Sequence, residues 1–140
     1  MTGNEILQPA VALMVWTMVM WAWMYATRIP AMTKAELQPD EAQKTGVLDE
    51  RLPASVQWKA HNHNHLHEQP TLFYAVVVIL VLIGEGGAAN ALLAWIYTGL
   101  RIAHSLVQAT ANKVMVRFVL YAISSVVLIV LIAKAAMTVF

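Results

Sequence analysis

The sequence predicts an all-α integral membrane protein, a four-helix up-down bundle that forms a single domain over residues 1–140. Three observations favour this fold class. Hydrophobic residues make up 59% of the chain and charged residues only 12%. Four apolar stretches each approach the roughly 20 residues that a helix needs to cross a bilayer. The last three stretches are joined by short connections, so successive helices are expected to be antiparallel neighbours.

The first crossing is expected at about 6–26, a stretch rich in methionine and tryptophan. Tryptophan favours the interface between membrane and water, so these side chains suit the ends of a crossing. A cleavable signal peptide is the alternative interpretation of this stretch. The acidic Glu5 and the absence of a basic segment before the apolar run disfavour that alternative.

The remaining crossings are expected at about 60–84, 88–111 and 114–136. A polar loop of about 30–55 separates the first two crossings. Within it, the order Pro-Asp-Glu predicts a short helix from Pro39 to about Lys44, because proline suits the first helical position.

Lysine and arginine are distributed unequally between the two ends of this bundle. The end with the long loop carries Arg28, Lys34, Lys44, Arg51, Lys59, Lys113 and Arg117, and the other end carries Lys134. The positive-inside rule therefore predicts a cytoplasmic loop and both termini on the opposite side of the membrane. The net charge is only +1 and basic residues are scattered, which argues against nucleic acid as a partner. Without cysteine, disulfides and thiolate metal sites are excluded.

A polar stripe interrupts the third crossing. Its members, at offsets 0, 3, 4, 7 and 11, are Arg101, His104, Ser105, Gln108 and Asn112. These offsets place all five on one helix face. Because an arginine at membrane depth costs about 2.5–3.5 kcal/mol, this face is expected to meet protein or water instead of lipid.

The neighbouring helices carry polar groups that we expect at similar depth. The second helix has His61, Asn64, His65 and Glu68 at offsets 0, 3, 4 and 7. Pro70 is expected to kink or loosen the turn that carries Glu68. The fourth helix opens with Arg117 and, one turn later, Tyr121. Such a recess could hold an anionic ligand or stabilise a thiolate, whereas a structural ion pair between Arg101 and Glu68 is the alternative.

The tract from His61 to His67 raises the possibility of a metal site, because imidazoles four residues apart on a helix can share zinc or copper. Alternate histidines on a helix point to two different faces, however. At most His61, His65 and Glu68 could converge, and we therefore expect no metal.

Three motifs in the expected helices resemble a known family. They are Asn64-x-x-x-Glu68-Gln-Pro70, Arg101-x-x-His104-Ser105 and Arg117-x-x-x-Tyr121. Their order and spacing are similar to the membrane-associated proteins in eicosanoid and glutathione metabolism, the MAPEG family, and to its bacterial members most. The resemblance implies a homotrimer in the bacterial inner membrane, with periplasmic termini. It also implies that glutathione binds as co-substrate between subunits, near the cytoplasmic side.

The same resemblance implies roles for individual residues. The expected glutathione contacts are Arg28, Asn64, Glu68, Arg101, His104 and Tyr121, together with Arg117. Glu68 would receive the amino group of the peptide and the arginines its carboxylates. Arg117 would be catalytic, stabilising the glutathione thiolate for attack on a lipophilic electrophile or hydroperoxide from the bilayer. Gln108 and Phe118 depart from the family pattern, as do His61 and His63.

A second class of function stays open. A non-enzymatic structural or lipid-binding membrane protein of the same fold could use its buried polar groups to specify helix register and assembly. Transport is disfavoured, because the sequence lacks the paired interrupted helices that are typical of secondary transporters.

Overall fold

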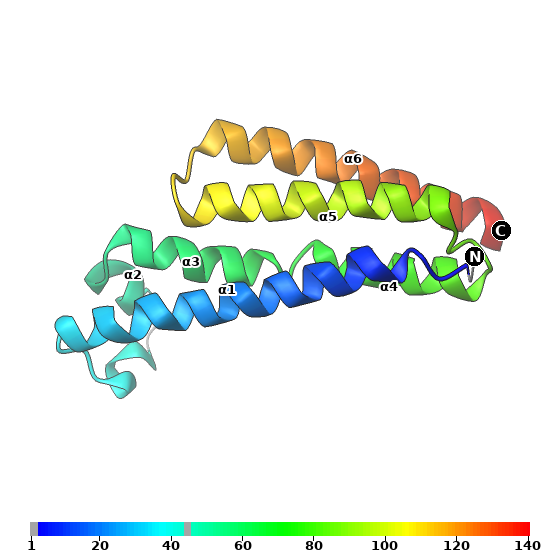
Figure 1. The fold of residues 1–140 in the computed structure, drawn as a ribbon. Helices are drawn as coiled ribbons and strands as arrows, with labels where there is room; N and C mark the ends of the chain where they lie inside the picture. The colour runs from blue at the N-terminus through cyan, green and yellow to red at the C-terminus, as the bar shows by residue number, and fades with distance from the viewer. Residues whose placement is uncertain (1–2, 44–45) are drawn as a thin grey trace.

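The computed structural model describes residues 3–43 and 46–140, and all regular structure in these ranges is helical (Figure 1). In chain order the elements are α1 (Leu7–Lys34), the 3-10 helix η1 (Pro39–Gln43), α2 (Val47–Arg51), α3 (Ala54–His65), α4 (Pro70–Leu82), α5 (Ala88–Ala109) and α6 (Val114–Val139). The all-α prediction is confirmed.

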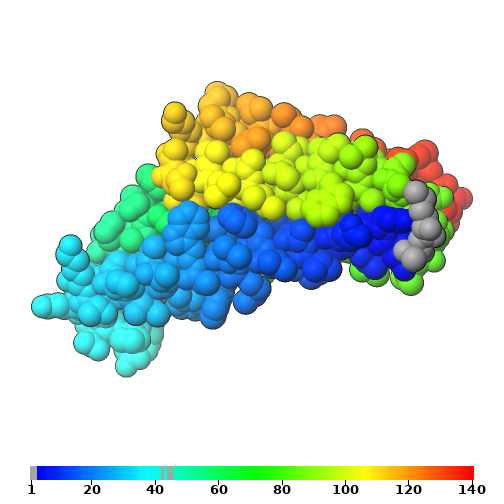
Figure 2. All heavy atoms as spheres, viewed as in Figure 1, coloured from blue at the N-terminus to red at the C-terminus, as the bar shows by residue number. Residues whose placement is uncertain are grey.

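The long helices lie side by side and alternate in direction (Figure 1). α1 runs one way, α3 and α4 return in succession, α5 runs back, and α6 returns again. Both chain ends and the turn between α4 and α5 therefore lie at one end of the molecule. The segment with η1 and α2 lies at the other end, with the turn between α5 and α6 on the same side. Figure 2 shows one face on which side chains of α5 lie directly against α1.

Three segments are long and apolar enough to cross a membrane: α1, the span Ala54–Leu82 that joins α3 to α4, and α6. α5 has 22 residues, which is sufficient length, but among the described residues it is not one of these segments. Its polar stripe lowers its mean hydropathy. A membrane crossing by α5 thus stays a prediction.

The boundaries of the first two long segments differ from those predicted. α1 continues through Pro30 to Lys34 instead of ending near residue 26. Its 28 residues span about 42 Å, more than the roughly 30 Å of a hydrocarbon core, so its last turns can project beyond the membrane. α3 begins at Ala54, about six residues early, which shortens the loop. The predicted short helix is the 3-10 helix η1, whereas Lys44 lies outside the described residues.

The second long segment is broken in the middle. α3 ends at His65 and α4 begins at Pro70, with the chain turning tightly between them. Because proline has no backbone N–H, it suits the first turn of a helix and interrupts the one before it. The loosening predicted at Pro70 is therefore confirmed.

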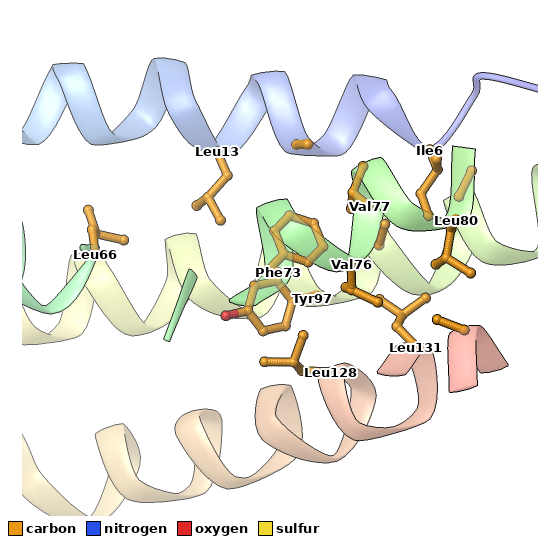
Figure 3. Packing of buried hydrophobic residues seen from close by; sticks show 14 of the residues in the cluster. Ile6, Leu13, Leu66, Phe73, Val76, Val77, Leu80, Tyr97, Leu128 and Leu131 are labelled. Carbon is orange, nitrogen blue, oxygen red and sulfur yellow. The ribbon is translucent and has the colours of Figure 1, made fainter. Parts of the chain in front are cut away.

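An apolar cluster fills the half of the bundle around α4 (Figure 3). Phe73 of α4 and Tyr97 of α5 stack with ring centres 4.4 Å apart and planes 25° apart. Ile6, Leu80 and Leu131 bring the start of α1, the end of α4 and the last half of α6 into the same cluster, all fully buried. This packing holds the four long helical segments together in the half of the bundle that lies away from the polar region.

Candidate functional site

The polar stripe of α5 faces protein, as the sequence predicts. Arg101, His104, Ser105 and Gln108 are all buried, and Asn112 is partly buried in the turn after α5. Arg101 and Ser105 have no exposed surface at all. The stripe therefore lies at the interface of α5 with its neighbours and not on the outer surface.

A cavity of about 270 Å³ opens beside this stripe, where α3 and α5 meet α6. Its lining consists of His65, His104, Val114, Arg117, Phe118 and Tyr121. Three residues predicted for the site, one from α5 and two from α6, thus lie around a single cavity. His65 joins them, although the sequence analysis placed it only on the polar face of its helix.

Arg101 lies next to the cavity without a hydrogen-bonding partner. Its guanidinium carbon is 5.6 Å from the ring centre of Tyr121. None of its three guanidinium nitrogens has a hydrogen-bond partner among the described residues. Burial of a charge without such partners is heavily penalised. This cation is therefore available to an anion that enters the region.

The end of α3 contributes an imidazole and a carboxylate. Nδ1 of His65 lies 3.2 Å from Oε2 of Glu68, three residues later in the break. The His65 ring centre is 4.9 Å from that of His104 and 5.7 Å from that of Tyr121. Glu68 is largely exposed while His65 is mostly covered. One carboxylate oxygen therefore holds the imidazole, and the side chain remains accessible from outside.

Arg117 is held by the turn between α5 and α6. Its guanidinium donates to Oδ1 of Asn112 at 2.7 Å, whereas its buried Nε has no partner among the described residues. Asn112 has a φ of 50°, a left-handed conformation that asparagine tolerates better than most residues. A tight turn thus keeps this cation at the lining of the cavity.

Two other predicted residues lie outside the cavity. Asn64 is exposed one residue before His65, about 100° further round the helix. Arg28 is partly buried on α1, which packs against α3 and α5, whereas the cavity lies on the α6 side. The single chain therefore brings together only part of the predicted set.

The ion pair considered between Arg101 and Glu68 does not form in the described part of the chain. Glu68 bonds His65 instead, because the break after α3 turns its side chain outward. Likewise, His61 is tied to Asp49 at 3.1 Å, so it does not converge with His65. The rings of His63 and His67 are in contact at a tilt of 54°, with centres 4.7 Å apart, and the histidines divide between different partners.

Sequence analysis missed a set of supporting amides. The buried Asn62 amide donates to the hydroxyl of Ser105, which also accepts from Nε1 of Trp16 at 2.8 Å. Gln69, in the break, donates to the Ser125 hydroxyl at 2.8 Å and accepts from the Tyr97 hydroxyl at 3.2 Å. The signal that could have found Asn62 is its position three residues before His65 in the expected helix, but its partner Ser105 lies 43 residues away in the sequence.

A family model matches nearly the whole chain. The model of the MAPEG family covers residues 6–137, from the start of α1 to the last turns of α6. The matched region includes every residue of the cavity lining. Comparisons with curated proteins and with solved structures gave no match.

Proposed function

The chain belongs to the MAPEG family, and from this premise we propose that it is a glutathione-dependent membrane transferase or peroxidase that acts on lipophilic electrophiles. The family includes glutathione-dependent transferases and peroxidases as well as other members. The three apolar helices found in the described part of this chain, together with its family membership, indicate an integral membrane protein. The specific activity is the proposal.

The observation that carries the proposal is the uncompensated positive charge beside the cavity. Among the described residues, none bonds the three guanidinium nitrogens of the buried Arg101, and Arg117 adds a fourth unbonded nitrogen at the cavity lining. Among the residues that line the cavity none is acidic. Glutathione carries two carboxylates and a thiol, so its binding would supply the anions that these guanidinium groups lack.

Each predicted residue then has a defined task. Arg117 stabilises the thiolate, because a cation within a few ångströms favours the charged form of a thiol. Arg101 binds a carboxylate, and His104 and Tyr121 offer hydrogen bonds. The exposed oxygen of Glu68 receives the amino group of the peptide.

A second subunit completes the site in this proposal. The cavity volume of about 270 Å³ falls just under the range of about 300–1,000 Å³ that is common for small-molecule pockets. Arg28 and Asn64, which lie outside the cavity of their own chain, would reach the glutathione of a neighbouring protomer in a homotrimer. In this proposal the membrane is a bacterial inner membrane and α5 is a fourth crossing. The asymmetry of lysine and arginine supports an orientation with the η1–α2 end in the cytoplasm and the termini in the periplasm.

The second substrate would reach the thiolate from the bilayer. Val114 and Phe118 line the cavity and are also strongly exposed on the outside of α6. An apolar electrophile could therefore enter between α5 and α6 without passing through water. The thiolate sulfur would then attack a carbon of the electrophile to form a C–S bond, while an electron pair passes to the leaving group or to the adjacent atom. With a hydroperoxide, an S–O bond would form as the O–O bond breaks and the alkoxide leaves.

Titration of the purified protein in detergent with glutathione tests the proposal. We expect saturable binding by calorimetry and the ultraviolet absorbance of a thiolate. Arg117→Ala is expected to abolish the thiolate absorbance, because the stabilising cation is lost. The exposed Lys113, four residues earlier, does not line the cavity, so Lys113→Ala is the matched control and should behave as wild type. A wild-type protein without saturable binding would falsify the enzyme proposal.

The second candidate is a non-enzymatic structural or lipid-binding protein of the same fold. The hydrogen bonds that join Asn62, Ser105 and Trp16 favour it, because buried hydrogen-bond networks fix helix register. Under this alternative, Arg101→Ala disrupts the oligomer in detergent, while Arg117→Ala leaves both assembly and function intact. Size measurement of the two variants in detergent separates the candidates.

A further inference from the structure

His65 is the one imidazole that α3 contributes to the cavity lining. It shares that lining with Arg117, the proposed partner of the thiolate, and its ring lies beside those of His104 and Tyr121. The residue has no task in the function proposed above. A neutral imidazole beside a bound thiol is well suited to accept a proton.

Glu68 fixes the tautomer of this imidazole. A carboxylate can only accept a hydrogen bond, so Nδ1 of His65, 3.2 Å from Oε2, carries the proton. The other ring nitrogen, Nε2, then keeps its lone pair. A carboxylate orients the histidine of a serine hydrolase in the same manner. The pairing depends on the break after α3, where the backbone N–H of Glu68 bonds the carbonyl of His65 at 3.1 Å.

The charges around His65 act differently on the two products of a proton transfer. The titratable and charged groups that face it are Glu68 from the break, Arg101 and His104 from α5, and Arg117 and Tyr121 from α6. After transfer, a thiolate would lie near Arg117, and an imidazolium would lie against Glu68. Each new charge would therefore have an opposite charge beside it, while Arg101 and Arg117 repel the imidazolium and so favour the return of its proton.

We propose that His65 is the general base that deprotonates the thiol of glutathione, with Glu68 as its positioning residue; this inference rests on the proposed function. The S–H bond breaks, its electron pair stays on sulfur, and an N–H bond forms at Nε2. When sulfur adds to the electrophile, the imidazolium returns the proton to the anion so formed. Proton and charge balance without a further reactant.

Rapid mixing of glutathione with the protein in detergent, followed by thiolate absorbance, tests this role. We expect His65→Gln to slow thiolate formation by about 10²-fold, the lower end for general-base catalysis, while calorimetry still detects saturable glutathione binding. Free imidazole added to the variant should restore part of the rate. His63→Gln is the matched control, because His63 precedes His65 by two residues, contacts the His67 ring and lies outside the cavity lining.

Glu68→Gln provides the second variant. The substituted side chain is largely exposed, so the fold should be kept, and its amide oxygen can still accept from Nδ1. The negative charge that balances the imidazolium is lost. We expect a rate at saturating glutathione between those of wild type and His65→Gln, which separates positioning from any effect on affinity.

A wild-type rate of thiolate formation in folded His65→Gln overturns the assignment. If that variant does not fold, a wild-type rate at saturation in Glu68→Gln overturns it instead. Absence of glutathione binding in the wild type has a different meaning, since it removes the proposed function and the role of His65 with it.

Discussion

The half of this bundle around α4 and the half around α3 share the same long helical segments but are packed in different ways. Around α4 the interior consists of apolar side chains such as Phe73, Leu80 and Leu131, which pack by van der Waals contact (Figure 3). Around α3 the interior contains Asn62, Arg101 and other polar groups. Helices in a membrane gain little from hydrophobic association and depend on packing and hydrogen bonds. The apolar half therefore stabilises the fold, while the polar half positions the side chains of the candidate site.

Substitutions in the apolar half should therefore mainly change stability, and substitutions in the polar half should mainly change function. In the polar half, the amide groups of Asn62 and Gln69 donate hydrogen bonds, whereas the guanidinium of Arg101 has no hydrogen-bond partner among the described residues. Buried hydrogen bonds specify the structure, whereas a buried cation without a partner lowers its stability. Substitutions that remove either kind of group test how far the two halves are independent.

The largest effect on stability is expected in the apolar half. Phe73→Ala removes a fully buried ring stacked on Tyr97, and we expect it to cost about 3–5 kcal/mol, since the cavity left behind loses its contacts. Unfolding in detergent measures this loss. The neighbouring Leu72 is exposed, so Leu72→Ala should change stability by less than about 0.5 kcal/mol. Equal losses in both variants would mean that this cluster is not the stabilising core.

The opposite sign is expected for Arg101→Met. Replacement of a buried ion by a hydrophobic residue of similar volume is often neutral or stabilising by about 1–4 kcal/mol. We therefore expect unchanged or higher resistance to unfolding, together with weaker glutathione binding by calorimetry.

Arg51→Met supplies the control for this variant. Arg51 is exposed and paired with Glu41 at 2.8 Å, so its loss should cost under about 1 kcal/mol and leave binding intact. A marked loss of stability in Arg101→Met would instead indicate that the assembled protein provides a carboxylate for this arginine.

Much of the fold could be predicted from the sequence, because its signals are local. The inward stripe that begins at Arg101 follows from spacing and from the cost of charge in lipid. The break before Pro70 follows from the missing N–H. The end of α1 could not be predicted, because Pro30 suggested a stop whereas the helix continues to Lys34.

The candidate site was predicted less completely, because its geometry depends on contacts between helices. Spacing placed His65 and Glu68 on one face of a regular helix. The break instead turns Glu68 outward and leaves it bonded to His65, so Arg101, its expected partner, has no hydrogen-bond partner within residues 3–43 and 46–140. The hydrogen bonds of Gln69 could not be predicted for the same reason, since its partners Tyr97 and Ser125 lie 28 and 56 residues away in the sequence.

The smallest effect is expected at the hydrogen bond that joins the two halves. The Gln69 amide donates to the Ser125 hydroxyl at 2.8 Å, so Ser125→Ala leaves that amide without its acceptor. We expect a cost of about 1 kcal/mol in unfolding experiments.

The hydroxyls of Ser124 and Ser125 both donate to the Tyr121 carbonyl at 2.8 Å, but only Ser125 is bonded to Gln69. Ser124→Ala is thus a matched control for the shared bond. Since the tether links the helix break to the turn of α6 that carries Tyr121, Ser125→Ala alone should also weaken glutathione binding. Identical behaviour of the two alanine variants would show that the tether contributes nothing beyond the shared helix contact.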